Sequence, residues 1–92
     1  MSNDHHFQID GQRWLWRYSP LKGKADGWTD FELRKVLIHS QLQGRKRLEI
    51  ELHEGLHAAL GPTISEESVT QTARDLAKIL WLLGYKIQEE SQ

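Results

Sequence analysis

LEIELHEGLHAAL, residues 48–60, repeats leucine every four residues, at Leu48, Leu52, Leu56 and Leu60. That spacing puts the leucines on one side of an α-helix, because the helix repeats every 3.6 residues. Most other positions are polar, so the segment predicts an amphipathic helix that covers a core with one face. The helical pattern begins near residue 45, and Gly61-Pro62 predicts its end.

A second helix is predicted after a short loop. Ser65 is its expected N-cap, because a serine hydroxyl accepts a hydrogen bond from a backbone N–H of the first turn. Apolar residues then recur at helical spacing until Gly84, a residue typical of helix ends. They are Val69, Ala73, Leu76, Leu80 and Leu83. Short connections make consecutive helices antiparallel neighbours, so the two segments predict a helical hairpin.

The N-terminal half carries strand patterns instead. Residues 7–9 and 13–18 flank Asp10-Gly11, a pair that favours a tight hairpin turn. In the second segment Trp14, Trp16 and Tyr18 alternate with arginine and leucine side chains. This period of two predicts a strand with one packed face.

The pattern of residues 35–42 predicts a further strand. Residues 21–30 contain glycines and charges and are expected to form an exposed loop. We expect Trp28 and Phe31 to hold this loop to the rest of the domain. We therefore expect an α+β fold: a small antiparallel sheet followed by an antiparallel pair of helices, the first carrying residues 53–57. The 92 residues fit a single domain. Segments 1–6 and 88–92 are polar and expected to be disordered.

Charge and composition narrow the classes of function. The formal net charge is -1, which gives no general attraction to nucleic acids or anionic membrane surfaces. No apolar run approaches the roughly 20 residues that a membrane-spanning helix needs. The absence of cysteine excludes disulfides and thiolate metal ligands. We expect a cytoplasmic protein that binds neither nucleic acid nor membrane.

His53 and His57 lie four residues apart on the first predicted helix, so their imidazoles project from one side, about 6 Å apart along the axis. Two imidazoles at this spacing can bind one zinc ion. Glu54 stands beside the first histidine, where its carboxylate can take a proton from a zinc-bound water without being a ligand. The pattern predicts a zinc site that activates water for attack on a carbonyl. In the alternative interpretation, both histidines are ordinary residues at the edge of the core.

A catalytic zinc site needs a third protein ligand and one open position. Candidate histidines upstream are His39, His5 and His6, and a carboxylate is the other option. The helical hairpin favours a carboxylate from the second helix, where Glu66 is within reach of the metal and Glu67 points further outward. Both acids also suit a first helical turn, where they complement the helix dipole, and this is the alternative interpretation of each.

Asp75 shares an arc of the second helix with Ile79 and Leu82, an unusual setting for an acid. It lies too far along the helix to be a ligand, and we expect it to orient a metal-binding histidine by hydrogen bonding. A solvated surface acid is the alternative. Tyr85 and Arg74 are candidates for stabilising an oxyanion.

LEIELHEGLHA, residues 48–58, resembles the active-site helix of zincin-type metallopeptidases. The runs SEESV, ARDLA and LWLLGY, which begin at residues 65, 73 and 80, are similar to small zincin-like proteins of bacteria and phages. The resemblance implies that His53 and His57 are zinc ligands and Glu54 is the general base. It implies that Glu66 or Glu67 completes the site, as in the gluzincin branch. It also implies that the strand at 35–42 lines the cleft and pairs with an extended substrate.

These observations lead us to expect a zinc-dependent metallopeptidase-like domain that hydrolyses peptide bonds in a peptide or protein substrate. The alternative is a non-catalytic protein-interaction module whose metal site is structural or vestigial. A nucleic-acid-binding regulator ranks third, because the net charge gives it no support.

Overall fold

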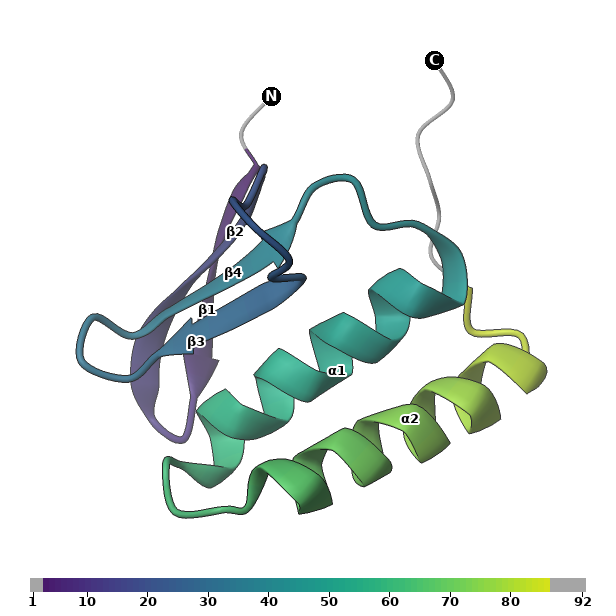
Figure 1. The fold of residues 1–92 in the computed structure, drawn as a ribbon. Helices are drawn as coiled ribbons and strands as arrows, with labels where there is room; N and C mark the ends of the chain where they lie inside the picture. The colour runs from purple at the N-terminus through teal and green to yellow at the C-terminus, as the bar shows by residue number, and fades with distance from the viewer. Residues whose placement is uncertain (1–2, 87–92) are drawn as a thin grey trace.

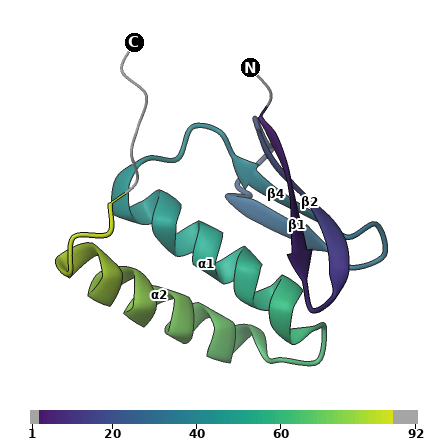
Figure 2. The ribbon, with the colours of Figure 1, turned by 180° about the vertical axis from the view of Figure 1, so that it is seen from behind.

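A computed structural model describes residues 3–86, which form four strands and two helices. In chain order they are β1 (Asp4–Ile9), β2 (Gln12–Ser19), β3 (Gly27–Asp30), β4 (Lys35–His39), α1 (Gly44–Leu60) and α2 (Glu66–Leu82). The sheet, α1 and α2 form three layers with α1 in the middle (Figure 1). Figure 2 shows the same layers from behind. The expected α+β class is confirmed.

The sheet is mixed, which corrects the expected antiparallel arrangement. Its strand order is β1-β2-β4-β3, and the central pair β2–β4 is parallel, while the β1–β2 and β3–β4 pairs are antiparallel. The cause is β3, which runs back along the outer edge before a tight turn at 31–34 returns the chain in the direction of β2. β4 therefore lies between β2 and β3.

Strand β3 occupies part of the segment 21–30, which we expected to be an exposed loop. Its four residues include a glycine and an aspartate, which have little preference for strands. The strand forms because it pairs with β4, with Trp28 opposite Leu37 and Thr29 opposite Val36. In the sheet of the described residues β3 is an edge strand, whereas β4 has a neighbour on both sides.

The hairpin of β1 and β2 turns at Asp10 and Gly11 as expected, and both residues have positive φ values, 51° and 75°. Residues 4–6 belong to β1, which corrects the expectation that they are disordered. They pair with β2, and the Arg17 guanidinium donates to both oxygens of the Asp4 carboxylate at 2.8 and 2.9 Å. Residues 1–2 and the expected disordered segment 88–92 lie outside the described residues.

Helix α1 is packed on both sides. One side contacts the sheet, and the core there consists of Trp14, Val36, Ile38 and Ala58. The other side contacts α2. The buried residues of α2 are Val69, Ala73 and Ala77, so this second interface is built largely from small side chains.

The helix boundaries agree with the sequence signals. Gly61 follows α1 with a φ of 88°, and the Ser65 hydroxyl accepts a hydrogen bond from the Ser68 backbone N–H at 3.0 Å. The Tyr85 backbone N–H donates to the Leu80 carbonyl at 2.9 Å and closes the end of α2. Neither helix of the described residues combines the length and the apolar character needed to cross a membrane.

A polar network ties α1 to β2. The Trp16 indole donates to the Tyr18 hydroxyl at 3.0 Å, and this hydroxyl donates to Glu51 at 2.5 Å. Arg47 donates to the same Glu51 oxygen at 3.1 Å, and its guanidinium lies 4.7 Å from the centre of the Tyr18 ring. Burial, followed by the hydrogen bond to Glu51, raises the pKa of Tyr18 above its ordinary value. We call these four residues the Tyr18 network.

Candidate metal centre

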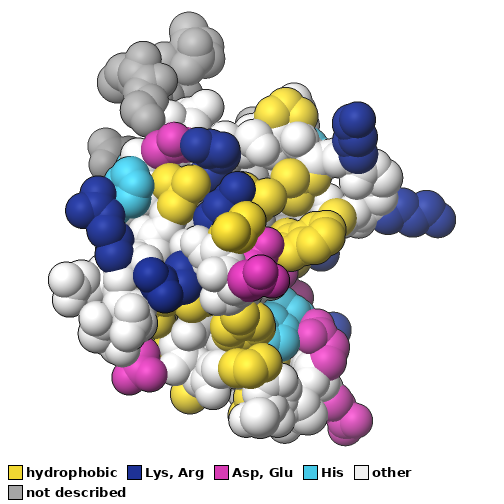
Figure 3. Space-filling view, turned by 90° about the vertical axis from the view of Figure 1, so that its left-hand side faces the viewer, with side chains coloured by type: hydrophobic (Ala, Val, Ile, Leu, Met, Phe, Trp, Pro, Cys, Tyr) yellow, Lys and Arg dark blue, Asp and Glu magenta, His cyan; other side chains and the backbone are white. Residues whose placement is uncertain are grey.

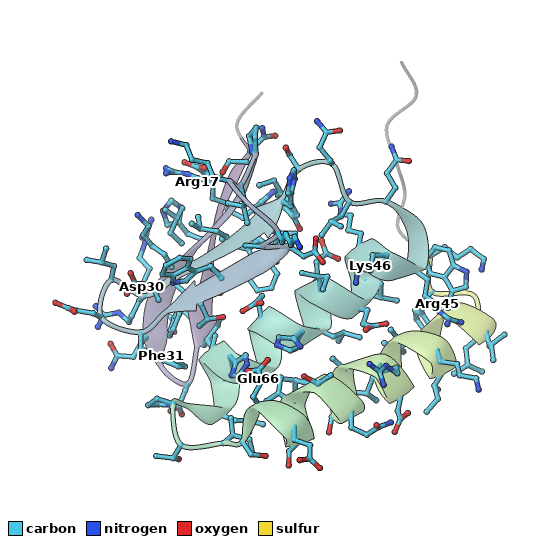
Figure 4. The ribbon with its side chains drawn as sticks, viewed as in Figure 1. Arg17, Asp30, Phe31, Arg45, Lys46 and Glu66 are labelled. Atoms are coloured by element: carbon cyan, nitrogen blue, oxygen red, sulfur yellow. The ribbon has the colours of Figure 1, made fainter. Side chains whose placement is uncertain are left out.

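Three side chains that can bind a metal meet where the two helices approach each other. His53 and His57 come from α1 and Glu66 comes from α2, and their ligand atoms all lie within 4.8 Å of one another. The Nε2 atoms of His53 and His57 each lie 2.8 Å from a different oxygen of the Glu66 carboxylate. Figure 4 shows Glu66 at the start of α2, on the side that faces α1. We call these three residues the metal centre.

Local structure places each member of the metal centre. The two histidines are one helical turn apart on α1, and their ring centroids are 5.0 Å apart. Glu66 is the first residue of α2, directly after the Ser65 cap, so the short connection 61–65 sets its carboxylate opposite the histidines. The histidine side chains are 17% and 15% exposed, whereas Glu66 is 69% exposed. The imidazoles are thus held by packing, and the carboxylate lies on the solvent side of the site.

The donor set fits zinc. Two imidazole nitrogens and one carboxylate oxygen are three of the four ligands of many catalytic zinc sites, and the fourth position stays open to water or substrate. Among the described residues, no lysine or arginine forms an ion pair with Glu66. The partners of the Glu66 carboxylate are instead the two imidazoles.

Glu54 lies beside the metal centre and is buried, with 8% of its surface exposed. The Thr29 hydroxyl of β3 lies 2.6 Å from Glu54 Oε1, to which it donates, and 3.2 Å from the Glu54 carbonyl. Glu54 and the metal centre line one open cavity of about 330 Å³. Its walls are formed by Gly27, Trp28, Thr29, Phe31, His53, Glu54, His57 and Glu66. In Figure 3, histidine side chains lie among acidic and apolar ones on this face of the molecule.

Other candidate ligands lie apart from the metal centre. His39 accepts a hydrogen bond from the Gln41 backbone N–H at 3.2 Å, and the His5 ring stacks at 6.0 Å on Phe7 in β1. His6 is exposed on β1, the strand furthest from β3. Glu67 is exposed and does not line the cavity. Of the acids at the start of α2, the structure therefore brings Glu66 alone to the histidines.

Asp75 does not orient a histidine. It is exposed and accepts a hydrogen bond from Gln71 at 3.0 Å, one turn earlier on α2. The physical reason is distance, because Asp75 lies nine residues, or roughly 13 Å of helix, beyond Glu66. Tyr85 and Arg74 are likewise exposed and do not line the cavity, so the structure gives neither a place beside a reacting carbonyl.

Strand β3 takes the place that we expected for the strand at 35–42. That strand, β4, is hydrogen-bonded on both sides and has no free edge for a substrate.

Phe31, just after β3, packs edge-on against Trp14 with ring centres 6.0 Å apart, as expected of an anchor, whereas Trp28 is 59% exposed. The contact between Thr29 and Glu54 was not predicted, and residues 25 positions apart carry no local signal of it.

Comparison with protein-family models, curated proteins and solved structures finds no significant match. The functional argument therefore rests on the residues and their geometry.

Proposed function

We propose that this chain is a zinc-dependent metallopeptidase-like domain that hydrolyses peptide bonds. The observation that carries the proposal is the meeting of two imidazoles and a carboxylate on a cavity that also holds the buried carboxylate of Glu54. Two histidines and one glutamate with an open fourth position are a known ligand set of zinc peptidases. It is also the ligand set that the resemblance to the gluzincin branch implies.

In the proposed mechanism His53, His57 and Glu66 hold zinc, which when bound polarises a carbonyl and makes water more acidic. Glu54 takes a proton from the attacking water and passes it to the leaving amine. Because this carboxylate is buried, few solvent molecules compete with the attacking water for its oxygens.

The proposed substrate is a peptide or protein segment in an extended conformation. β3 is an edge strand, and three of its residues line the same cavity as the metal centre. The edge of a sheet pairs readily with an extended peptide through backbone hydrogen bonds. Such pairing would carry a peptide bond past Glu54. A cytoplasmic location remains a prediction from composition.

Zinc binding is the first test of the proposal. A calorimetric titration of metal-stripped protein should show one zinc per chain. His57→Ala should weaken binding at least about 100-fold, because one of three ligands is removed. Glu67→Gln is the matched control, since this acid lies next to Glu66 but outside the cavity, and it should bind zinc like the wild type. Equal binding by His57→Ala would refute the site.

Peptide hydrolysis is the second test. Zinc-loaded protein should cleave an unstructured peptide mixture, with new termini detected by mass spectrometry. Glu54→Gln should lower kcat at least about 100-fold, because a positioned base is lost, while zinc stays bound. Full activity in this variant would rule out Glu54 as the base.

A second candidate function is a protein-interaction module with a structural metal site. It is favoured by large apolar side chains exposed near the end of α2, which are Ile79, Leu82, Leu83 and Tyr85, between 51% and 74% exposed. Protein that binds zinc tightly but cleaves no peptide at any zinc concentration would favour this candidate over the first.

A further inference from the structure

Strand β3 lies against Glu54 with the face that it turns toward α1. Strand residues alternate between the two faces of a sheet, so Gly27 and Thr29 share one face. Thr29 lies opposite Val36, a fully buried core residue, which places the threonine side chain toward α1. Its hydroxyl reaches Glu54 Oε1 at 2.6 Å. A four-residue edge strand therefore touches the residue that the proposed function makes the general base.

Gly27 fits against the same carboxylate because it has no side chain. A Cβ atom at this position would lie 2.8 Å from Glu54 Cγ, 2.9 Å from Glu54 Oε2 and 3.0 Å from Ile50 Cγ2. Real Cβ atoms essentially never come closer than 3.0 Å to such atoms, so any larger residue would displace Glu54 or the strand. Gly27 is not among the residues with positive φ. Space, and not backbone conformation, is the reason for a glycine here.

We propose that Thr29 is a positioning residue for Glu54, and that Gly27 leaves the space in which the positioned carboxylate sits. This inference rests on the proposed function. The hydroxyl holds Oε1, which leaves Oε2, on the Gly27 side, to accept the proton of the attacking water. A neutral hydroxyl orients the carboxylate without placing a positive charge beside it. Such a charge would make the carboxylate a weaker proton acceptor. The same strand, β3, would thus pair with the substrate along its edge and hold the general base Glu54 in position.

Kinetics of matched threonine variants test the inference. Thr29→Val keeps the shape but removes the hydroxyl, and it should lower kcat about 10- to 100-fold with KM and zinc affinity unchanged, because the base is misplaced. Thr29→Ser keeps the hydroxyl and should restore most of kcat. If Thr29→Val is as active as the wild type, or if Thr29→Ser is as impaired as Thr29→Val, the positioning role is refuted.

Glycine variants test the space beside Glu54. Gly27→Ala should lower kcat and leave zinc affinity unchanged, because the atoms nearest to the added methyl belong to Glu54 and Ile50. Gly55→Ala on α1 is the matched control, since its added Cβ would lie 3.6 Å from the Trp16 ring, an ordinary contact. Wild-type kcat in Gly27→Ala would overturn the steric part of the inference.

A measurement without turnover separates this inference from the proposed function. Urea unfolding of metal-free protein is compared for wild type, Thr29→Val, Glu54→Ala and the double variant. Coupled residues should give a double variant whose unfolding constant differs from the product of the two single effects. Independent effects would refute the contact. A coupled pair in protein that binds zinc but cleaves nothing would refute the proposed function, and the catalytic role of Thr29 with it.

Discussion

Two polar clusters involve helix α1, the Tyr18 network and the metal centre, and they differ in whether an arginine faces their carboxylates. In the Tyr18 network Arg47 does so: the guanidinium bonds to Glu51 and lies over the Tyr18 ring. Each polar group of the network thus has a partner within the protein. Such a network satisfies its own charges and fixes a helix to a sheet.

The metal centre contains the Glu66 carboxylate, and the Glu54 carboxylate lies beside it; within the described residues no ion pair joins either carboxylate to a lysine or arginine. The two imidazoles are the partners of Glu66, and the Thr29 hydroxyl donates to Glu54. The comparison separates a cluster that is complete from one that fits an added cation. The predictions below test this difference, from the largest expected change in stability to the smallest.

Zinc should stabilise the fold only through the metal centre. At free zinc about 1,000 times the dissociation constant, binding to the folded state alone raises the free energy of unfolding by about 4 kcal/mol. Urea unfolding with and without zinc measures this increment. It should vanish in His53→Ala and persist in Glu51→Ala; its loss in the latter would mean that the two clusters are not separate.

Removing the carboxylate from the Tyr18 network should destabilise the fold at any zinc concentration. Glu51→Ala leaves the Tyr18 hydroxyl and the Arg47 guanidinium without their shared acceptor, at a cost of about 2 kcal/mol. Thermal or urea unfolding of metal-free protein measures it. An unchanged midpoint would show that the network contributes nothing to stability.

The stability contributed by the Tyr18 network should decrease at alkaline pH, where the Tyr18 hydroxyl ionises. Burial and the bond to Glu51 raise the folded-state pKa of Tyr18 above its ordinary 10.0. The stabilisation is therefore fully present below pH 10 and is lost as pH rises through the folded-state pKa. Tyr18→Phe should cost about 1 kcal/mol at neutral pH. Its deficit should shrink above pH 10, and a deficit constant with pH would contradict the assignment.

Glu66→Gln should change the stability of metal-free protein by less than about 0.5 kcal/mol, because the residue is largely exposed. The same variant should bind zinc at least about tenfold more weakly, since an amide is a poorer ligand than a carboxylate. Glu67→Gln is the control for both measurements. A large loss of stability without zinc would instead make Glu66 a structural clamp on the histidines.

The helical half was predictable because its signals are local. Gly61-Pro62 and Ser65 mark helix ends through the conformation of a few neighbouring residues, and the spacing of His53 and His57 follows from the helical repeat. Because the loop between the helices is short, few residues of the second helix can lie opposite His53 and His57. Glu66 could be placed from that geometry, although Asp75, further along, could not.

The sheet was less predictable because its pairing is not local. β3 contains four residues with weak strand preference and exists through its ladder with β4. The parallel pairing of β2 and β4 depends on β3, which reverses the direction of the chain between them. Thr29 and Gly27 could not be linked to Glu54 without knowing that β3 forms the edge of the sheet beside α1.

The small residues at the interface between the helices have a consequence for local opening. Ala73 and Ala77 have small side chains that bury little surface, so we expect α2 to open locally and to exchange amide hydrogens early. Zinc would join the first turn of α2 to α1 at Glu66 and slow exchange there. The last turn, at Leu82, lies a full helix length from this attachment. With metal bound, the first turn of α2 would be protected from amide exchange, whereas its last turn would still open locally.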